Sequence, residues 1–99
     1  MRLTPAQILA IRDIVQQTAS AHQSVRVFGS RLDDAARGGD LDLLVEFTSV
    51  VENPALLSAQ LSAKISRVMH GRKVDVLLSA PNLLHLPIHD IAFQEGAVL

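Results

Sequence analysis

The sequence predicts a small α/β (α+β) domain in which a mixed β-sheet is flanked by helices. Apolar residues recur at helical spacing in some segments and alternate with polar residues in others. The predicted elements follow the order α-β-β-α-β-α, so we expect three strands with the helices on one side. A length of 99 residues suits one core, so residues 1–99 are expected to form a single domain.

The first helix is predicted to begin at Pro5. Thr4 can cap its first turn, proline is favoured at the first helical position, and Gln7 completes a capping-box pattern. The residues that then recur at helical spacing are Ile8, Ile11, Val15 and Thr18. A loop is expected over residues 20–24, which are mostly polar.

Two strands are predicted next, over residues 25–28 and 40–47. The first stops at Gly29, and the second has the clearest alternation of apolar and polar positions. One of its faces carries Leu41, Leu43, Val45 and Phe47. The other face carries Asp40, Asp42, Leu44 and Glu46. Because Leu44 shares the polar face, this face is not expected to be plain surface.

A second helix is predicted from Asn53 and Pro54 to a stop at Gly71. Its apolar positions at helical spacing are Leu57, Leu61, Ile65 and Val68.

The last third of the chain predicts a strand and a short helix. The strand covers residues 73–78 and carries Asp75 within an apolar run. The helix covers about 86–95 and ends at Gly96. Residues 97–99 are expected to form a tail or an edge strand.

Composition excludes several classes of protein. Aromatic residues make up only 3% of the chain, so its core must be aliphatic, and the absence of cysteine excludes disulfides and thiolate zinc sites. No apolar run is long enough to span a membrane, and no leader opens the chain, so a cytoplasmic protein is expected. A formal charge of -1 does not provide the basic surface that extended nucleic-acid binding needs.

Three aspartates are candidates for a metal site. Asp40 and Asp42 are two apart on one strand face, which places their Cα atoms roughly 6.5–7 Å apart. Carboxylates this close repel unless a cation lies between them, and Mg²⁺ prefers oxygen ligands and shares itself with phosphates. Asp75 supplies a third carboxylate. The alternative, which a bare Asp-x-Asp would favour, is the solvated face of an amphipathic strand.

The turn before this strand is a candidate phosphate site. Gly29 lacks the Cβ that would keep a phosphate from the backbone, and Ser30 offers a hydroxyl and an N–H group. Arg31 and Arg37 can neutralise phosphate charge. Taken singly these residues are weak signals, since Gly-Ser is a common loop dipeptide and a lone arginine is usually a surface charge.

Other residues have structural explanations. His85 and His89 are four apart and could face a zinc ion from one helix, but a packing or surface role is favoured in a chain without cysteine. Apolar positions near Leu83, Leu84 and Leu86 are candidates for an interface in a homodimer or a hetero-oligomer.

Taken together, the motifs resemble those of a known family. They are Gly29-Ser30-Arg31, Ala36-Arg37, Asp40-x-Asp42-Leu43-Leu44-Val45 and Val74-Asp75-Val76. They look like the motifs of the minimal nucleotidyltransferases, the MNT proteins of the DNA polymerase beta superfamily, which are usually found beside HEPN-domain proteins in prokaryotes. The resemblance covers nearly the whole chain. One departure is Gly39, where the family often has serine.

The resemblance implies a nucleotidyltransferase fold, ATP as substrate and a two-metal Mg²⁺ site. Asp40 and Asp42 would be metal ligands, and Asp75 would complete the triad nearest the incoming hydroxyl.

It also implies that Gly29 and Ser30 hold the triphosphate. Arg31 and Arg37 would contact phosphate or the partner protein.

The function implied is AMP transfer from ATP to a hydroxyl, with a tyrosine of a HEPN toxin as the acceptor, so that the chain acts as a type VII-like antitoxin. Two alternatives stay open. One is a non-catalytic antitoxin that neutralises its partner by binding. The other is an aminoglycoside-type nucleotidyltransferase working as a homodimer, which is disfavoured because a single small domain has no evident acceptor pocket.

Overall fold

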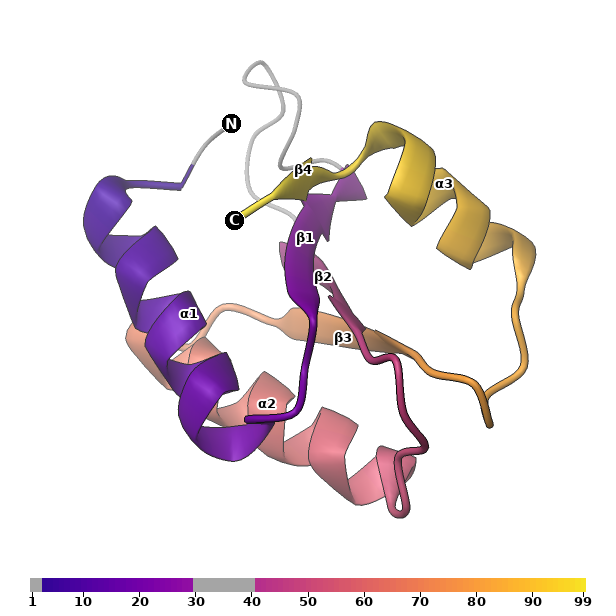
Figure 1. Cartoon of the computed structure of the whole chain (residues 1–99). Coiled ribbons are helices and arrows are strands. Elements are labelled where there is room, and N and C mark those ends of the chain that lie inside the picture. The colour runs from indigo at the N-terminus through magenta and orange to yellow at the C-terminus, as the bar shows by residue number, and fades with distance from the viewer. Residues whose placement is uncertain (1–2, 30–40) are drawn as a thin grey trace.

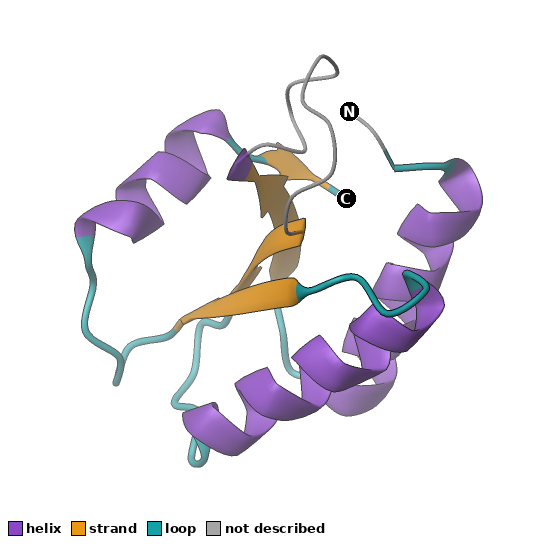
Figure 2. Ribbon diagram, turned by 180° about the vertical axis from the view of Figure 1, so that it is seen from behind, coloured by secondary structure: helices purple, strands orange, loops and turns teal. Residues whose placement is uncertain are grey.

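The computed structural model describes residues 3–29 and 41–99, and these residues form a four-stranded sheet with helices on both faces (Figures 1 and 2). The predicted order of elements is confirmed, with one short strand added at the end. The elements are α1 (Pro5–Thr18), β1 (Ser24–Phe28), β2 (Leu41–Glu46), α2 (Pro54–Val68), β3 (Val74–Ser79), α3 (Pro87–Glu95) and β4 (Ala97–Val98).

The sheet is mixed, as predicted. Its strand order is β3-β2-β1-β4, with β2 and β3 parallel and the other two neighbouring pairs antiparallel. Of the two alternatives for residues 97–99, the edge strand is correct, because Ala97 and Val98 pair with β1 and the Leu99 N–H donates to the Val25 carbonyl at 2.9 Å.

The predicted capping box at the start of α1 is present. The Thr4 N–H donates to Gln7 Oε1 at 2.9 Å, and the Gln7 N–H donates to Thr4 Oγ1 at 3.1 Å. These bonds satisfy two backbone donors that a helix start leaves without partners. The helix therefore begins at the residue where the sequence predicts it.

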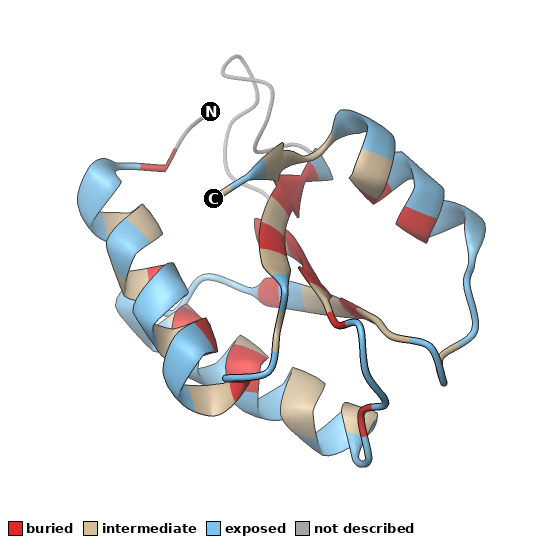
Figure 3. Cartoon of the chain, in the orientation of Figure 1, coloured by how far each residue is buried: buried red, intermediate tan, exposed pale blue. Residues whose placement is uncertain are grey.

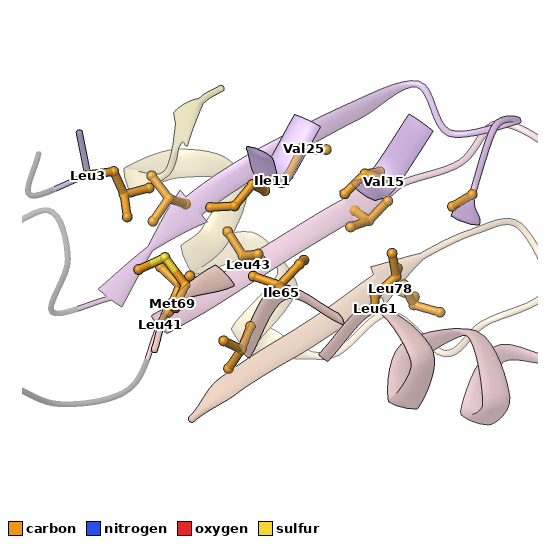
Figure 4. Close-up of a cluster of buried hydrophobic side chains, with 14 of the residues drawn as sticks. Leu3, Ile11, Val15, Val25, Leu41, Leu43, Leu61, Ile65, Met69 and Leu78 are labelled. Carbon is orange, nitrogen blue, oxygen red and sulfur yellow. The ribbon is translucent and has the colours of Figure 1, made fainter. Parts of the chain in front are cut away.

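The main core lies between one face of the sheet and the helices α1 and α2. Leu41, Leu43 and Val45 of β2 are fully buried there, as the alternation in this strand predicts. Figure 4 shows side chains of α1, β2 and α2 pointing toward one another in this aliphatic cluster. In Figure 3 the buried residues of both helices lie on the sides that face the sheet.

The helix α3 covers the opposite face, so the expectation of helices on one side is wrong. Phe28, Leu44 and Ala92 form a second buried cluster between this face and α3. In Figure 1, α1 and α2 lie on one side of the sheet and α3 on the other. The physical reason is the apolar Leu44 and Phe28 on that face, which would lie in water without a covering helix. The expectation that the Leu44 face is not plain surface is confirmed.

The free edge of β3 is covered by side-chain donors. The Ser58 hydroxyl donates to the Val76 carbonyl at 2.8 Å, and the Ser62 hydroxyl donates to the Val74 carbonyl. His89 bonds the Leu78 carbonyl at 2.9 Å. These carbonyls point away from β2, so the bonds satisfy edge acceptors that otherwise attract a further strand.

His89 is a structural residue, as the packing interpretation predicts. Its side chain is buried, and Nδ1 accepts a hydrogen bond from the Leu86 N–H at 2.9 Å. The ring proton is therefore on Nε2, which donates to the Leu78 carbonyl. No nitrogen lone pair is left for zinc. His85 is exposed and bonds Asp90 at 2.7 Å, so its surface role is also confirmed.

Replacing His89 by alanine is expected to lower the free energy of unfolding by about 2–4 kcal/mol, because the change leaves the Leu78 carbonyl and the Leu86 N–H without partners. Urea unfolding followed by circular dichroism measures this change. The control is His85→Ala, which alters an exposed ring and is expected to stay within about 0.5 kcal/mol. Equal losses in the two variants would contradict the structural role of His89.

Among the helices described, none combines the length and the apolar character that a bilayer crossing requires.

Candidate active site

Two of the predicted carboxylates meet at one end of the sheet. Asp42 and Asp75 are register partners on the parallel strands β2 and β3. Neighbouring strands are about 4.8 Å apart, so the two side chains start side by side on the same face. Asp42 is also the register partner of Phe28, the last residue of β1, and Gly29 follows directly. Asp75 is thus next to Asp42, a proximity that periodicity alone did not predict.

Gly29 makes room for the Asp42 carboxylate. Its φ of +74° lies in the left-handed region that glycine adopts readily. A Cβ added at this position would overlap Asp42 Oδ2 and lie 3.3 Å from Cγ. The glycine is therefore needed for a contact within the site, in addition to the approach of a phosphate that the sequence suggests.

A cavity of about 350 Å³ opens beside the carboxylate pair. Asp42 is partly buried and Asp75 is exposed. The lining residues are Phe28, Gly29, Asp42, Asp75, Val76, Leu77, Ile88 and Ile91. The cavity therefore has two carboxylates at one side and aliphatic and aromatic side chains over the rest of its wall.

Four of the predicted site residues, Ser30, Arg31, Arg37 and Asp40, lie outside the described residues. Asp40 directly precedes Leu41, whose N–H donates to the Lys73 carbonyl at 3.0 Å where β2 joins β3. Within residues 3–29 and 41–99, no group of three metal-ligating side chains is found. The described part of the site holds two of the three predicted carboxylates.

The sequence did not predict that α3 would line the cavity with apolar side chains. Ile88 is three residues before Ile91 and four before Ala92, so the three side chains share one broad apolar face of α3. Ala92 packs in the second core cluster, and the two isoleucines line the cavity. The width of this apolar face on a nine-residue helix was the signal available in the sequence.

The chemistry of the site suits a divalent cation next to an anion. Two carboxylates at strand spacing repel, and a cation between them removes the repulsion. Carboxylate oxygens are preferred ligands of Mg²⁺. Gly29 lies against the Asp42 carboxylate, so a phosphate bound to a cation on Asp42 would lie beside the Gly29 backbone. The residues present therefore fit a metal-bound phosphate compound.

Neither the protein-family models nor the curated protein sequences give a match to this chain. Solved structures do. A toxin–antitoxin crystal structure with AMP-PNP matches 97% of this chain and 72% of its own, with a TM-score of 0.69 and 18% identity. A tri-AMPylated Shewanella oneidensis HEPN toxin in complex with MNT antitoxin matches 93% of this chain and 70% of its own, with a TM-score of 0.60 and 18% identity. The chain has the fold of the MNT antitoxins.

A MntA–HpeT toxin–antitoxin complex bearing two aspartate-to-glutamate substitutions also has this MNT fold. Its TM-score is 0.69 at 16% identity, over 97% of this chain and 71% of the other. The predicted nucleotidyltransferase fold is thereby confirmed. In this chain the MNT fold brings Gly29, Asp42 and Asp75 to one end of the sheet, with α3 as the apolar wall.

Proposed function

We propose that residues 1–99 form one Mg²⁺-dependent nucleotidyltransferase domain that moves AMP from ATP to a tyrosine hydroxyl of a partner HEPN toxin, and so acts as its antitoxin. The observation that carries this proposal is the in-register pair Asp42 and Asp75 beside Gly29. Two of the similar structures support the nucleotide and the partner. One of them holds AMP-PNP, and the other contains a tri-AMPylated HEPN toxin with an MNT antitoxin.

The carboxylates have distinct roles in this proposal. Asp40 and Asp42 hold Mg²⁺, and Asp75 completes the ligand set on the side of the acceptor. When bound, Mg²⁺ neutralises charge that develops on the transferring phosphoryl group and the leaving pyrophosphate. Asp75 is the more exposed of the two described carboxylates, which suits a group that an incoming hydroxyl must reach.

The proposed triphosphate-binding site consists of residues that follow β1. Gly29 and Ser30 hold the triphosphate through backbone N–H groups and a hydroxyl. Arg31 and Arg37 contact phosphate or the partner.

In the proposed transfer, one bond to the α-phosphorus of ATP forms and one breaks. The acceptor oxygen forms a bond to the α-phosphorus of ATP, and the bond from that phosphorus to the bridging oxygen of pyrophosphate breaks. Pyrophosphate leaves with that electron pair. The hydroxyl proton passes to the Asp75 carboxylate, which acts as general base.

The proposal is tested with the purified chain, ATP, Mg²⁺ and the product of the neighbouring gene, which is expected to be a HEPN-domain protein. Intact-mass spectrometry is expected to show the partner heavier by one or more AMP groups, and omission of Mg²⁺ is expected to abolish the gain. A stable complex without any mass gain would overturn the proposal and favour a binding-only antitoxin. Transfer to an aminoglycoside but not to the partner would favour the small-molecule alternative.

A further inference from the structure

Two isoleucines of α3 border the candidate active site while remaining open to solvent. Ile88 is 40% exposed and Ile91 is 44% exposed, and both line the cavity that contains Asp42 and Asp75. In the described part of the chain, the exposed large apolar side chains between residues 84 and 91 are Leu84, Leu86, Ile88 and Ile91. Of these, Ile88 and Ile91 are the two that lie beside the carboxylates, and exposed apolar side chains next to a polar site are candidates for a binding surface.

The position of α3 explains why the isoleucines face the carboxylates. Near its start, His89 bonds the Leu78 carbonyl, close to the carboxyl end of β3. At its other end, Phe93 lies under the Arg26 guanidinium of β1, 5.2 Å from ring centroid to Arg26 Cζ, and the chain turns at Gly96 into β4.

The helix therefore crosses the sheet diagonally, from the end of β3 to β1 (Figure 1). It leaves open the corner where β2 and β3 begin, and this corner holds Asp42 and Asp75. Gly29 lies on the β1 side of Asp42, whereas Val76 and Leu77 extend the cavity on the β3 side. An apolar group bound in this part of the cavity would therefore lie next to Asp75, on the side away from Gly29.

A ligand suited to this corner is polar at one end and apolar along its body. A phenol side chain has this division, since its hydroxyl is polar and its ring is apolar. A sugar or an aminoglycoside carries polar groups all around and would leave them unpaired against Leu77 and the two isoleucines.

The apolar surface also continues beyond the cavity. Val76 and Leu77 line a second cavity of about 300 Å³, which Leu83 and Leu84 border as well. An acceptor attached to a protein segment can use this extension, whereas a small molecule cannot.

We infer that Ile88 and Ile91 form the subsite for the ring of an acceptor tyrosine carried by a partner protein, and that they select a phenolic hydroxyl over an aliphatic or sugar hydroxyl. This inference rests on the proposed function and names the part of the chain that recognises the acceptor. The ring packs on α3 and Leu77, with its hydroxyl directed toward Asp75.

The test compares the unsubstituted chain with Ile88→Ala, Ile91→Ala and the double variant. In the double variant the KM for the partner is expected to rise between about 10- and 100-fold, because several methylene-sized groups leave the contact. The dissociation constant for AMP-PNP with Mg²⁺, measured by calorimetry without the partner, is expected to change less than about twofold. In the double variant, the rate of AMP transfer to a partner whose acceptor tyrosine is replaced by serine is expected to rise relative to the rate with the tyrosine form.

The control variant is Leu56→Ala, which removes an exposed leucine of α2 and is expected to change none of these quantities. The single isoleucine variants report on the subsite if the double variant unfolds. Loss of AMP-PNP affinity with an unchanged KM for the partner would overturn the inference, since Ile88 and Ile91 would then contact the adenine base of ATP. Partner kinetics equal to those of the unsubstituted chain would also overturn it. If the unsubstituted chain itself transfers no AMP, the proposed function fails, and the inference fails with it.

Discussion

Replacing Asp42 by asparagine is expected to lower AMP transfer by about 10³-fold or more while leaving the fold intact. An amide is a poorer metal ligand than a carboxylate and carries no charge. The loss of metal-based stabilisation of the transition state corresponds to about 4 kcal/mol or more. The two side chains are nearly isosteric, so the neighbouring Gly29 and Asp75 keep their places.

The measurement is single-turnover transfer of labelled AMP to the partner, together with the unfolding midpoint in urea. Asp13→Asn is the matched control, because it makes the same chemical change on the exposed surface of α1. Transfer at the normal rate in Asp42→Asn would show that Asp42 is not a metal ligand. A large loss of stability in this variant, with activity lost in proportion, would point to a structural role instead.

Replacing Gly29 by alanine is expected to lower AMP transfer by about 10²-fold or more, because the new Cβ would overlap Asp42 Oδ2. The carboxylate must move, and its alignment with Asp75 is then lost. Alanine at a φ of +74° also costs stability, by about 1–2 kcal/mol.

Gly71→Ala separates these two effects. Gly71 follows α2 with a φ of +79°, so alanine there has a similar backbone cost, but no atom lies within 4 Å of its added Cβ. Gly29→Ala also displaces the Asp42 carboxylate, so it is expected to lose at least as much stability in urea unfolding as Gly71→Ala, whereas only Gly29→Ala loses transfer. Equal activity in both variants would contradict the role of Gly29 in placing Asp42.

Local signals in the sequence predict the elements of this fold well. The capping box at Thr4 and Gln7 and the alternation of Leu41, Leu43 and Val45 depend only on residues close in the chain. Such patterns report the periodicity of a single element and the face that it buries. They do not report which element covers that face.

The side on which α3 packs is an example of this limit. The periodicity of α3 shows an apolar stripe, but Ala92 and Phe93 fit either face of a sheet. The tertiary structure places them against Phe28 and Leu44. The diagonal course of α3, and with it the open corner at Asp42 and Asp75, follows from that packing.

The sequence by itself determined the chemical types in the candidate site. Gly29, the aspartates at 40 and 42, and Asp75 stand out because carboxylates within apolar runs and a glycine before a strand are local features. Only the tertiary structure decided that Asp75 pairs with Asp42, because strand register is set by contacts between residues 33 positions apart. It alone also decided that Asp42 needs Gly29 to have no side chain, and that two isoleucines of α3 border the carboxylates. Distances between separate elements depend on packing, which no single segment encodes.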